Sequence, residues 1–162
     1  MGRDDSLVVL QSVFVLDRRG FSAIELLVVI AIVGVISATS VPWMITYWRS
    51  ATLRAAAEEL AAGLNRARQL AISQNRSVCV EVTGGQYRLR VGGCAAAVWT
   101  GLGTGTNGFF TLTNRVTVAT NANPVFDYLG AAVPAATLTV TNPQGGATRN
   151  VVVSAAGRVQ IQ

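Results

Sequence analysis

The sequence predicts an α+β fold in which a long N-terminal α-helix packs on a small antiparallel β domain. Three observations support this fold: residues 21–42 are almost entirely apolar, residues 43–75 show a helical apolar pattern, and residues 76–162 contain short alternating segments separated by Gly, Asn and Pro. Residues 1–20 form a separate leading segment. A chain of 162 residues accommodates one domain and an anchor.

The apolar stretch is long enough to cross a membrane. Residues 21–41 carry one charge, Glu25, and as a helix they would span about 31 Å, the thickness of a bilayer's hydrocarbon core. A cleaved secretory signal has a shorter run that ends in an Ala-x-Ala site, whereas this run continues into a helical pattern, as a signal anchor does. Arg18 and Arg19 precede it, so the N-terminus is expected in the cytoplasm and the β domain in the periplasm or outside.

Glu25 is the unusual residue of this stretch. A carboxylate carried to mid-membrane costs about 2.5–3.5 kcal/mol, so an intramembrane acid indicates function and needs a partner. If the chain were cut after Gly20, the new amine of Phe21 would lie four residues from Glu25, on the same helix face. The amine of a neighbouring copy can then supply the counter-charge.

The series Arg18-Arg19-Gly20, Phe21, Glu25 and about 20 apolar residues resembles the class III signal of type IV pilins and type II secretion pseudopilins. The resemblance implies that a prepilin peptidase cleaves between Gly20 and Phe21 and that Phe21 is N-methylated. It further implies storage in the inner membrane, followed by assembly on an inner-membrane platform into a filament where Glu25 pairs with an adjacent subunit's amine. Residues 1–20 are longer than a typical leader of this family, which favours a true start further downstream.

Two residues of the apolar stretch, Gly34 and Pro42, match the family's helix-loosening positions. Proline inside a helix removes a hydrogen bond and kinks the helix, and glycine lowers helix propensity. The alternative for Pro42 is that it begins a second helix at the first turn.

Residues 43–75 have the pattern of an amphipathic helix. Its apolar residues recur at spacings of three and four, which defines one helix face; they are Leu53, Ala57, Leu60, Leu64, Ala67 and Ala71. We expect this face to pack on the sheet. Trp43, Tyr47 and Trp48 follow the apolar stretch, where aromatic rings favour the membrane interface, or pack between helices in a filament.

The remaining sequence predicts short strands. Residues 77–82 and 86–91 flank Gly84-Gly85, a hairpin signal, and apolar residues alternate with Gln86, Arg88 and Arg90 in the second segment. A Gly- and Ala-rich loop is expected at residues 92–108. Further strands are predicted at residues 109–112, 116–119, 125–128, 137–141, 149–154 and 158–161.

The segment from Ala61 to Ile72 and the strand that follows it are similar to the GspH/FimT-like subgroup of minor pilins and pseudopilins, as are Trp99-Thr100-Gly101 and the late Gly157-Arg158. This second resemblance covers roughly residues 50–162. It implies a filament-tip or priming subunit.

The two cysteines, Cys79 and Cys94, bracket the predicted hairpin. In an oxidising periplasm they can form a disulfide, and closing a 15-residue loop stabilises a fold by about 3 kcal/mol. The alternative is two free thiols, because the hairpin register places Cys79 nearer Arg90 than Cys94. A Gly-rich return after Val91 can still join them. Their spacing is not a metal-binding motif.

Charge and composition bound the function. The chain has 13 Arg, no Lys and no His, with a formal net charge of +5 and a pI near 10.2. This balance favours anionic partners such as nucleic acid or lipid head groups; genome composition is the alternative explanation. No histidine base, G-x-S-x-G elbow or phosphate loop is present, so we expect neither catalysis nor a cofactor.

DNA binding is the rival to a structural role. Some FimT-like minor pilins use a Gly-Arg-x-Arg motif to capture DNA in natural transformation. The matching residues here are Gly157-Arg158-Val159-Gln160, so the second arginine is replaced. Arg88, Arg90 and Arg149 compensate if the fold brings them near Arg158; otherwise Arg158 is a solvated residue after a turn glycine.

The sequence thus predicts a minor pilin or pseudopilin, a structural subunit of a type II secretion pseudopilus or a type IV pilus. Its expected partners are other pilins or pseudopilins, the prepilin peptidase, the assembly platform and the membrane. The alternative is a DNA-binding minor pilin, with DNA as a further partner.

Overall fold

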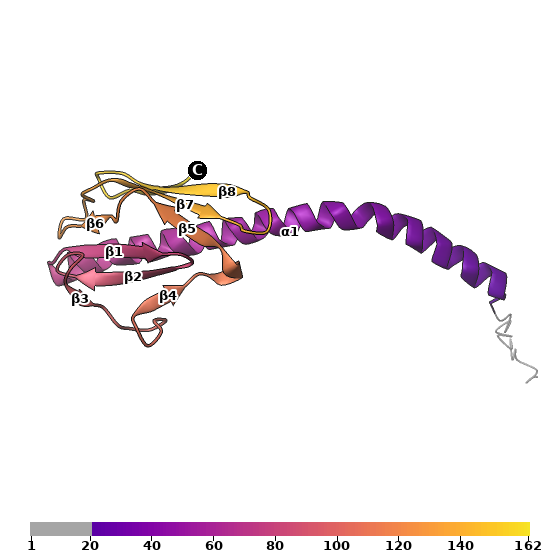
Figure 1. Ribbon diagram of the computed structural model, residues 1–162, viewed down its shortest axis with the longest axis horizontal. Coiled ribbons are helices and arrows are strands. Elements are labelled where there is room, and N and C mark those ends of the chain that lie inside the picture. Colours follow the sequence, from indigo (N-terminus) through magenta and orange to yellow (C-terminus); the bar gives the residue numbers. More distant parts are fainter. Residues whose placement is uncertain (1–20) are drawn as a thin grey trace, which may run out of the picture. The chain divides into compact units, whose positions relative to one another are not determined.

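A computed structural model describes residues 21–162 (Figure 1). Contacts divide the chain into two compact units, one ending at Val41 and one comprising Pro42–Gln162, and each is described by itself. The elements are helix α1 (Ala23–Gln74), strands β1 (Val78–Thr83), β2 (Gln86–Val91), β3 (Ala97–Val98) and β4 (Phe109–Thr111), the 3₁₀ turn η1 (Thr113–Arg115), and strands β5 (Thr117–Thr120), β6 (Val125–Phe126), β7 (Ala136–Thr141), β8 (Thr148–Val153) and β9 (Val159–Ile161).

Helix α1 is assigned without a break through both Gly34 and Pro42. The alternative in which Pro42 begins a second helix is therefore wrong. The helix ends at Gln74, where Asn75 adopts a positive φ of 52°. Asparagine tolerates this left-handed conformation better than most residues, so the chain can leave the helix there and enter β1.

The strands form two antiparallel sheets. The first has the order β3-β2-β1-β6, with β4 also paired to β2, and the second has the order β5-β7-β8-β9. The β1–β2 hairpin pairs Thr83 with Gln86 and Val78 with Val91. The turn of this hairpin is held to strand β5, because the Val118 N–H donates to the Gly84 carbonyl at 2.7 Å.

One hydrophobic core joins the C-terminal part of α1 to both sheets. All six apolar residues of the predicted helix face are buried. Strand β2 alternates as predicted, with Tyr87 and Leu89 buried and Arg88 and Arg90 only partly so. The α+β fold, with one long helix packed on antiparallel sheets, is confirmed.

The predicted strands agree with the structure to within two residues at each end. Strand β3 is the exception, since Ala97 and Val98 fall in the segment expected to be a loop. They pair with Val91 and Arg90 of β2. A two-residue strand has no alternation that a sequence pattern can detect.

Candidate functional site

The candidate assembly residue Glu25 lies in the first turn of α1, and the candidate processing residues Gly20 and Phe21 precede the helix in the sequence. Gly20 lies outside the described residues. Phe21 is 79% exposed, and the Glu25 backbone N–H donates to the Ser22 hydroxyl at 3.3 Å. Ser22 caps the helix in this geometry, and Ser22-Ala-Ile-Glu25 has the S-x-x-E spacing of a capping box. Sequence reasoning missed this role of Ser22, although the motif is visible in the sequence.

The Glu25 carboxylate takes part in no ion pair within residues 21–162. It belongs to the first turn of α1, where the helix dipole favours a negative charge. The next charged residue along the chain is Arg49. Glu25 is thus the single charged residue of the helical segment before Arg49.

The surface of this segment is apolar and open. Among the described residues, α1 is the one helix long and apolar enough to span a membrane. The exposed large side chains before Pro42 are Phe21, Ile24, Leu26, Leu27, Val28, Val29, Ile30, Ile32, Val33, Val35, Ile36 and Val41. The hydroxyls of Thr39 and Ser40 both donate to the Ile36 carbonyl at 2.9 Å, so these polar groups are satisfied within the helix.

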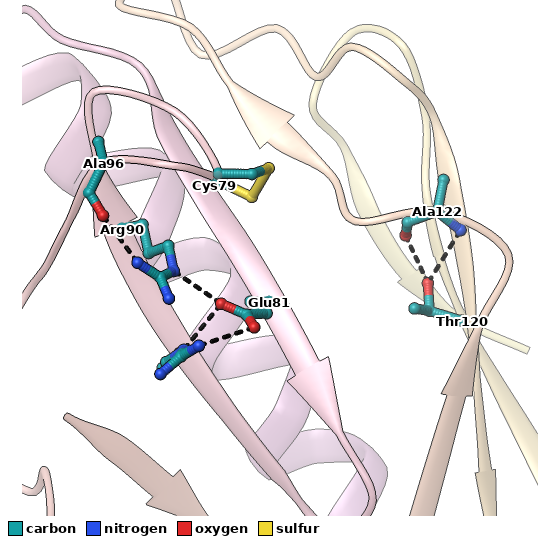
Figure 2. Close-up of a disulfide and its surroundings, with 8 residues drawn as sticks. Cys79, Glu81, Arg90, Ala96, Thr120 and Ala122 are labelled. Atoms are coloured by element: carbon teal, nitrogen blue, oxygen red, sulfur yellow. Dashed lines mark hydrogen bonds and ion pairs between the residues drawn. A yellow bond between two sulfur atoms is a disulfide. The ribbon is translucent and has the colours of Figure 1, made fainter. Parts of the chain in front are cut away.

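Cys79 and Cys94 form a disulfide, with their Cα atoms 5.0 Å apart (Figure 2). In the hairpin register Cys79 pairs with Arg90, as the sequence indicated. The chain returns to Cys79 because Gly92 and Gly93 adopt positive φ values of 107° and 112°. These conformations suit glycine and turn the segment after β2 back toward β1.

Glu81 of β1 binds two arginines of β2 (Figure 2). Arg88 donates to both carboxylate oxygens at 2.7 and 2.8 Å, and Arg90 donates to Oε2 at 2.7 Å. Arg90 also donates to the Ala96 carbonyl at 2.8 Å. The hydrogen bonds from Arg88 and then Arg90 lower the pKa of Glu81 from its ordinary value of 4.5 to about 2.

Arg158 is exposed in the turn before β9. Its backbone N–H donates to the Ser154 hydroxyl at 3.1 Å, and its carbonyl accepts from the Ser154 N–H at 2.9 Å. The preceding Gly157 has a φ of +74°, and a side chain there would collide with the Gly130 carbonyl. The Gly-Arg pair therefore has a structural reason for its glycine.

The arginines considered as helpers of Arg158 do not gather around it. Arg88 and Arg90 are bound to Glu81 in the other sheet. The pairing of Val153 with Val159 places Arg158 near the end of β8, whereas Arg149 lies near its start, about 13 Å away along the strand. The condition for a compensating basic patch is therefore not met.

The sequence analysis also did not predict a stack of an arginine on aromatic rings. The Arg66 guanidinium lies 4.9 Å from the centre of the Trp99 ring and 5.3 Å from that of Phe110. Tyr87 stacks on Phe110 at 5.0 Å. The four residues come from α1, β2, β4 and the loop between β3 and β4, so their proximity depends on the tertiary fold.

Comparisons with known proteins agree with this fold. The sequence model of the family described as "Type II transport protein GspH" matches residues 56–157. Among curated proteins, none matches the chain.

Two solved proteins are similar in structure. The type IV minor pilin FimU of Pseudomonas aeruginosa is 24% identical, with a TM-score of 0.52 over 68% of this chain and 92% of that one. A second crystal form of FimU is 26% identical, with a TM-score of 0.52 over 68% and 87%. The minor pseudopilin EpsH from the type 2 secretion system of Vibrio cholerae is 10% identical, with a TM-score of 0.54 over 68% and 95%.

Proposed function

The chain belongs to the GspH family of minor pilins and pseudopilins, and we propose that it is a structural subunit added at the tip of a filament or during its priming. The filament is a type II secretion pseudopilus or a type IV pilus. Members of this family are structural subunits rather than enzymes. We accordingly assign no catalytic role to this chain.

Glu25 is the observation that carries the proposal. It is the single charge between Phe21 and Trp48, and it has no ion pair within the described residues. A carboxylate in an apolar environment needs a counter-charge, and an α-amine at Phe21 of an adjacent subunit would supply it. The pairing would set the register between neighbouring helices.

The exposed apolar surface of α1 suits two successive environments, the membrane and then the filament. A helix of this kind is stable in the hydrocarbon core of the inner membrane, and it is equally stable against the apolar helices of other subunits. We place the subunit first in that membrane as a single span, with its N-terminus cytoplasmic and residues 76–162 periplasmic, and then in the filament. Prepilin peptidase would cleave between Gly20 and Phe21 and N-methylation of Phe21 would follow, before the assembly platform adds the subunit.

The test is Glu25→Gln, which removes the charge and keeps the shape of the side chain. We expect the leader to be cleaved normally, as measured by the mass of the N-terminal peptide. Incorporation into purified filaments, measured by immunoblot, should fall at least tenfold, because the register contact is lost.

The matched control is Glu58→Gln, which removes an exposed carboxylate that is paired with Arg54 at 2.9 Å. This variant should assemble like the unmodified chain. Normal filament incorporation of Glu25→Gln would contradict the proposal, and so would an equal loss in both variants.

Capture of DNA at Arg158 is the second candidate, and no contact in the structure favours it. The motif around Arg158 has Gln160 in place of its second arginine. Arg88, Arg90 and Arg149 lie away from Arg158. The proposal is therefore limited to assembly.

A further inference from the structure

A basic cavity of about 240 Å³ lies between α1 and the turn that joins β7 to β8. The polar residues that matter here are Arg49 and Ser50 of α1, Asn142 of the turn, and Thr148 and Arg149 of β8. Of the arginines considered as DNA contacts, Arg149 lines this cavity and Arg158 does not.

The cavity is positively charged without a balancing acid. Arg49 and Arg149 both line it, and no Asp or Glu does. Neither arginine takes part in an ion pair within residues 21–162. The Arg49 side chain lies against the turn, because its Cδ is 3.4 Å from where a Cβ of Gly145 would be. Two guanidinium groups that share one cavity attract an anion.

Asn142 provides a second, independent observation. It is only 6% exposed and is the one buried polar side chain among the described residues. Its Oδ1 accepts the Gln144 N–H at 2.9 Å, which leaves the side-chain amide as a donor, and that donor has no partner in the described chain. Because Asn142 lines the cavity, its side-chain amide can donate to an acceptor bound there.

The donors suit a tetrahedral oxyanion. The residues that line the cavity include two arginines, Asn142 and Thr148, whose side chains carry several N–H and O–H donors. Arginine binds phosphate oxygens through paired, charge-assisted hydrogen bonds. A phosphate group has enough acceptor oxygens for both arginines and the Asn142 amide, whereas a single chloride ion or water has fewer acceptor positions.

The position in the sequence favours a lipid as the source of the phosphate. Arg49 follows Val41, the last residue of the apolar stretch, by eight residues. Trp43, Tyr47 and Trp48, which lie between them, are 82%, 70% and 59% exposed. Aromatic rings beside an apolar span are typical of the membrane interface, where phospholipid head groups lie.

We propose that Arg49, Asn142 and Arg149 form a phosphate-binding site that takes the head group of an anionic phospholipid. The lipid source rests on the membrane storage in the proposed function, whereas the phosphate chemistry does not. Entry into a filament would then require release of the head group.

The test uses the full chain in phosphatidylcholine nanodiscs and follows the backbone amide NMR signals of residues 144–148. One series replaces phosphatidylcholine stepwise by phosphatidylglycerol. The other adds inorganic phosphate to discs without phosphatidylglycerol. We expect saturable shifts in the first series and a much weaker response in the second.

Three variants probe the site. Arg49→Gln and Arg149→Gln should each weaken the phosphatidylglycerol response about tenfold or more, since each loses a charge-assisted contact. Asn142→Asp keeps an acceptor for the Gln144 N–H but places a carboxylate in the cavity, so the response should be abolished while the fold remains.

The matched control is Arg54→Gln, which removes one exposed positive charge of the same helix outside the cavity. Arg54→Gln lowers the general attraction to an anionic surface by the same single charge as Arg49→Gln or Arg149→Gln. Its phosphatidylglycerol response should nevertheless stay within twofold of that of the unmodified chain. A response as strong to inorganic phosphate would keep the phosphate site but overturn the lipid source. No saturable response in either series, or an equal loss in Arg54→Gln, would overturn the site itself. Filament incorporation of the Glu25 variant is measured separately, so failure here does not decide the proposed assembly role.

Discussion

Glu81 joins β1 to β2 through two arginine side chains. Its side chain is 27% exposed, and those of Arg88 and Arg90 are 20% and 19% exposed. Partial burial strengthens these hydrogen bonds relative to pairs on the open surface. The Arg88 guanidinium also lies 4.6 Å from the centre of the Phe109 ring. The polar face of β2 is therefore occupied by internal contacts.

This triad makes the stability of the Pro42–Gln162 unit depend on pH. The folded pKa of Glu81, about 2, is below its ordinary 4.5, so its contribution is complete above pH 4.5 and is lost as pH falls to 2. With solvent screening, the contribution is on the order of 1–2 kcal/mol. Glu81→Gln should lower the free energy of unfolding by that amount at pH 7 and flatten its dependence between pH 5 and 2.

Urea unfolding of the Pro42–Gln162 fragment at several pH values checks this prediction. Glu58→Gln is the control, because the Glu58 side chain is 55% exposed and forms only a surface pair with Arg54. Parallel pH curves for the unmodified fragment and Glu81→Gln would contradict it.

At the scale of elements, the contact of α1 with the first sheet depends on Gly63. A Cβ at this position would meet the Tyr87 ring, with Cε2 at 2.8 Å and the phenol oxygen closer still. Tyr87 is 5% exposed and stacked on Phe110, so it has little room to move. Glycine is less favourable than alanine in a helix by about 1 kcal/mol, and here it permits close approach of the ring.

Gly63→Ala should therefore destabilise the Pro42–Gln162 fragment by about 1–3 kcal/mol, despite the gain in helix propensity. Tyr87→Phe removes the nearest atom, so the double variant should lose less stability than the sum of the two single changes. Thermal or urea unfolding of the four proteins measures this coupling.

Gly34→Ala in the full chain is the matched comparison, because no atom lies within 4 Å of a Cβ at Gly34. That change should leave the unfolding of the β domain unaltered. A Gly63→Ala variant as stable as the unmodified fragment would refute the steric account.

For the whole molecule, the net charge of +5 is not concentrated at one site. Arg54, Arg88 and Arg90 are paired, Arg66 lies on aromatic rings, and Arg49 and Arg149 line the basic cavity. Arg158 is exposed at a different end of β8 from Arg149. DNA attraction, where it exists, should follow total charge rather than one residue.

We expect duplex DNA to bind the Pro42–Gln162 fragment weakly at low salt, with a steep loss as salt increases. Arg158→Gln should reduce binding no more than Arg76→Gln, another exposed arginine. Fluorescence anisotropy over a range of salt concentrations measures both. A selective loss in Arg158→Gln would establish Arg158 as a DNA contact and revive the alternative function.

Local patterns account for the parts of the fold that could be predicted from the sequence. The apolar stretch, the face from Leu53 to Ala71 and the strand positions depend on hydrophobic periodicity and turn residues, which neighbouring residues along the chain reveal. The GspH-like resemblance of residues 50–162 indicated the family for the same reason, because its motifs, such as Ala61 to Ile72, are short stretches of adjacent residues.

Contacts between distant segments decided the rest. Whether Cys79 meets Cys94 depended on the conformations of Gly92 and Gly93, and the fate of Arg88 and Arg90 depended on their register against Glu81. The cavity beside Asn142 is lined by both α1 and β8, and its two arginines, Arg49 and Arg149, are far apart in the sequence. Periodicity predicts which side of an element is buried, but the partner across the core is set by how the helix and the two sheets pack.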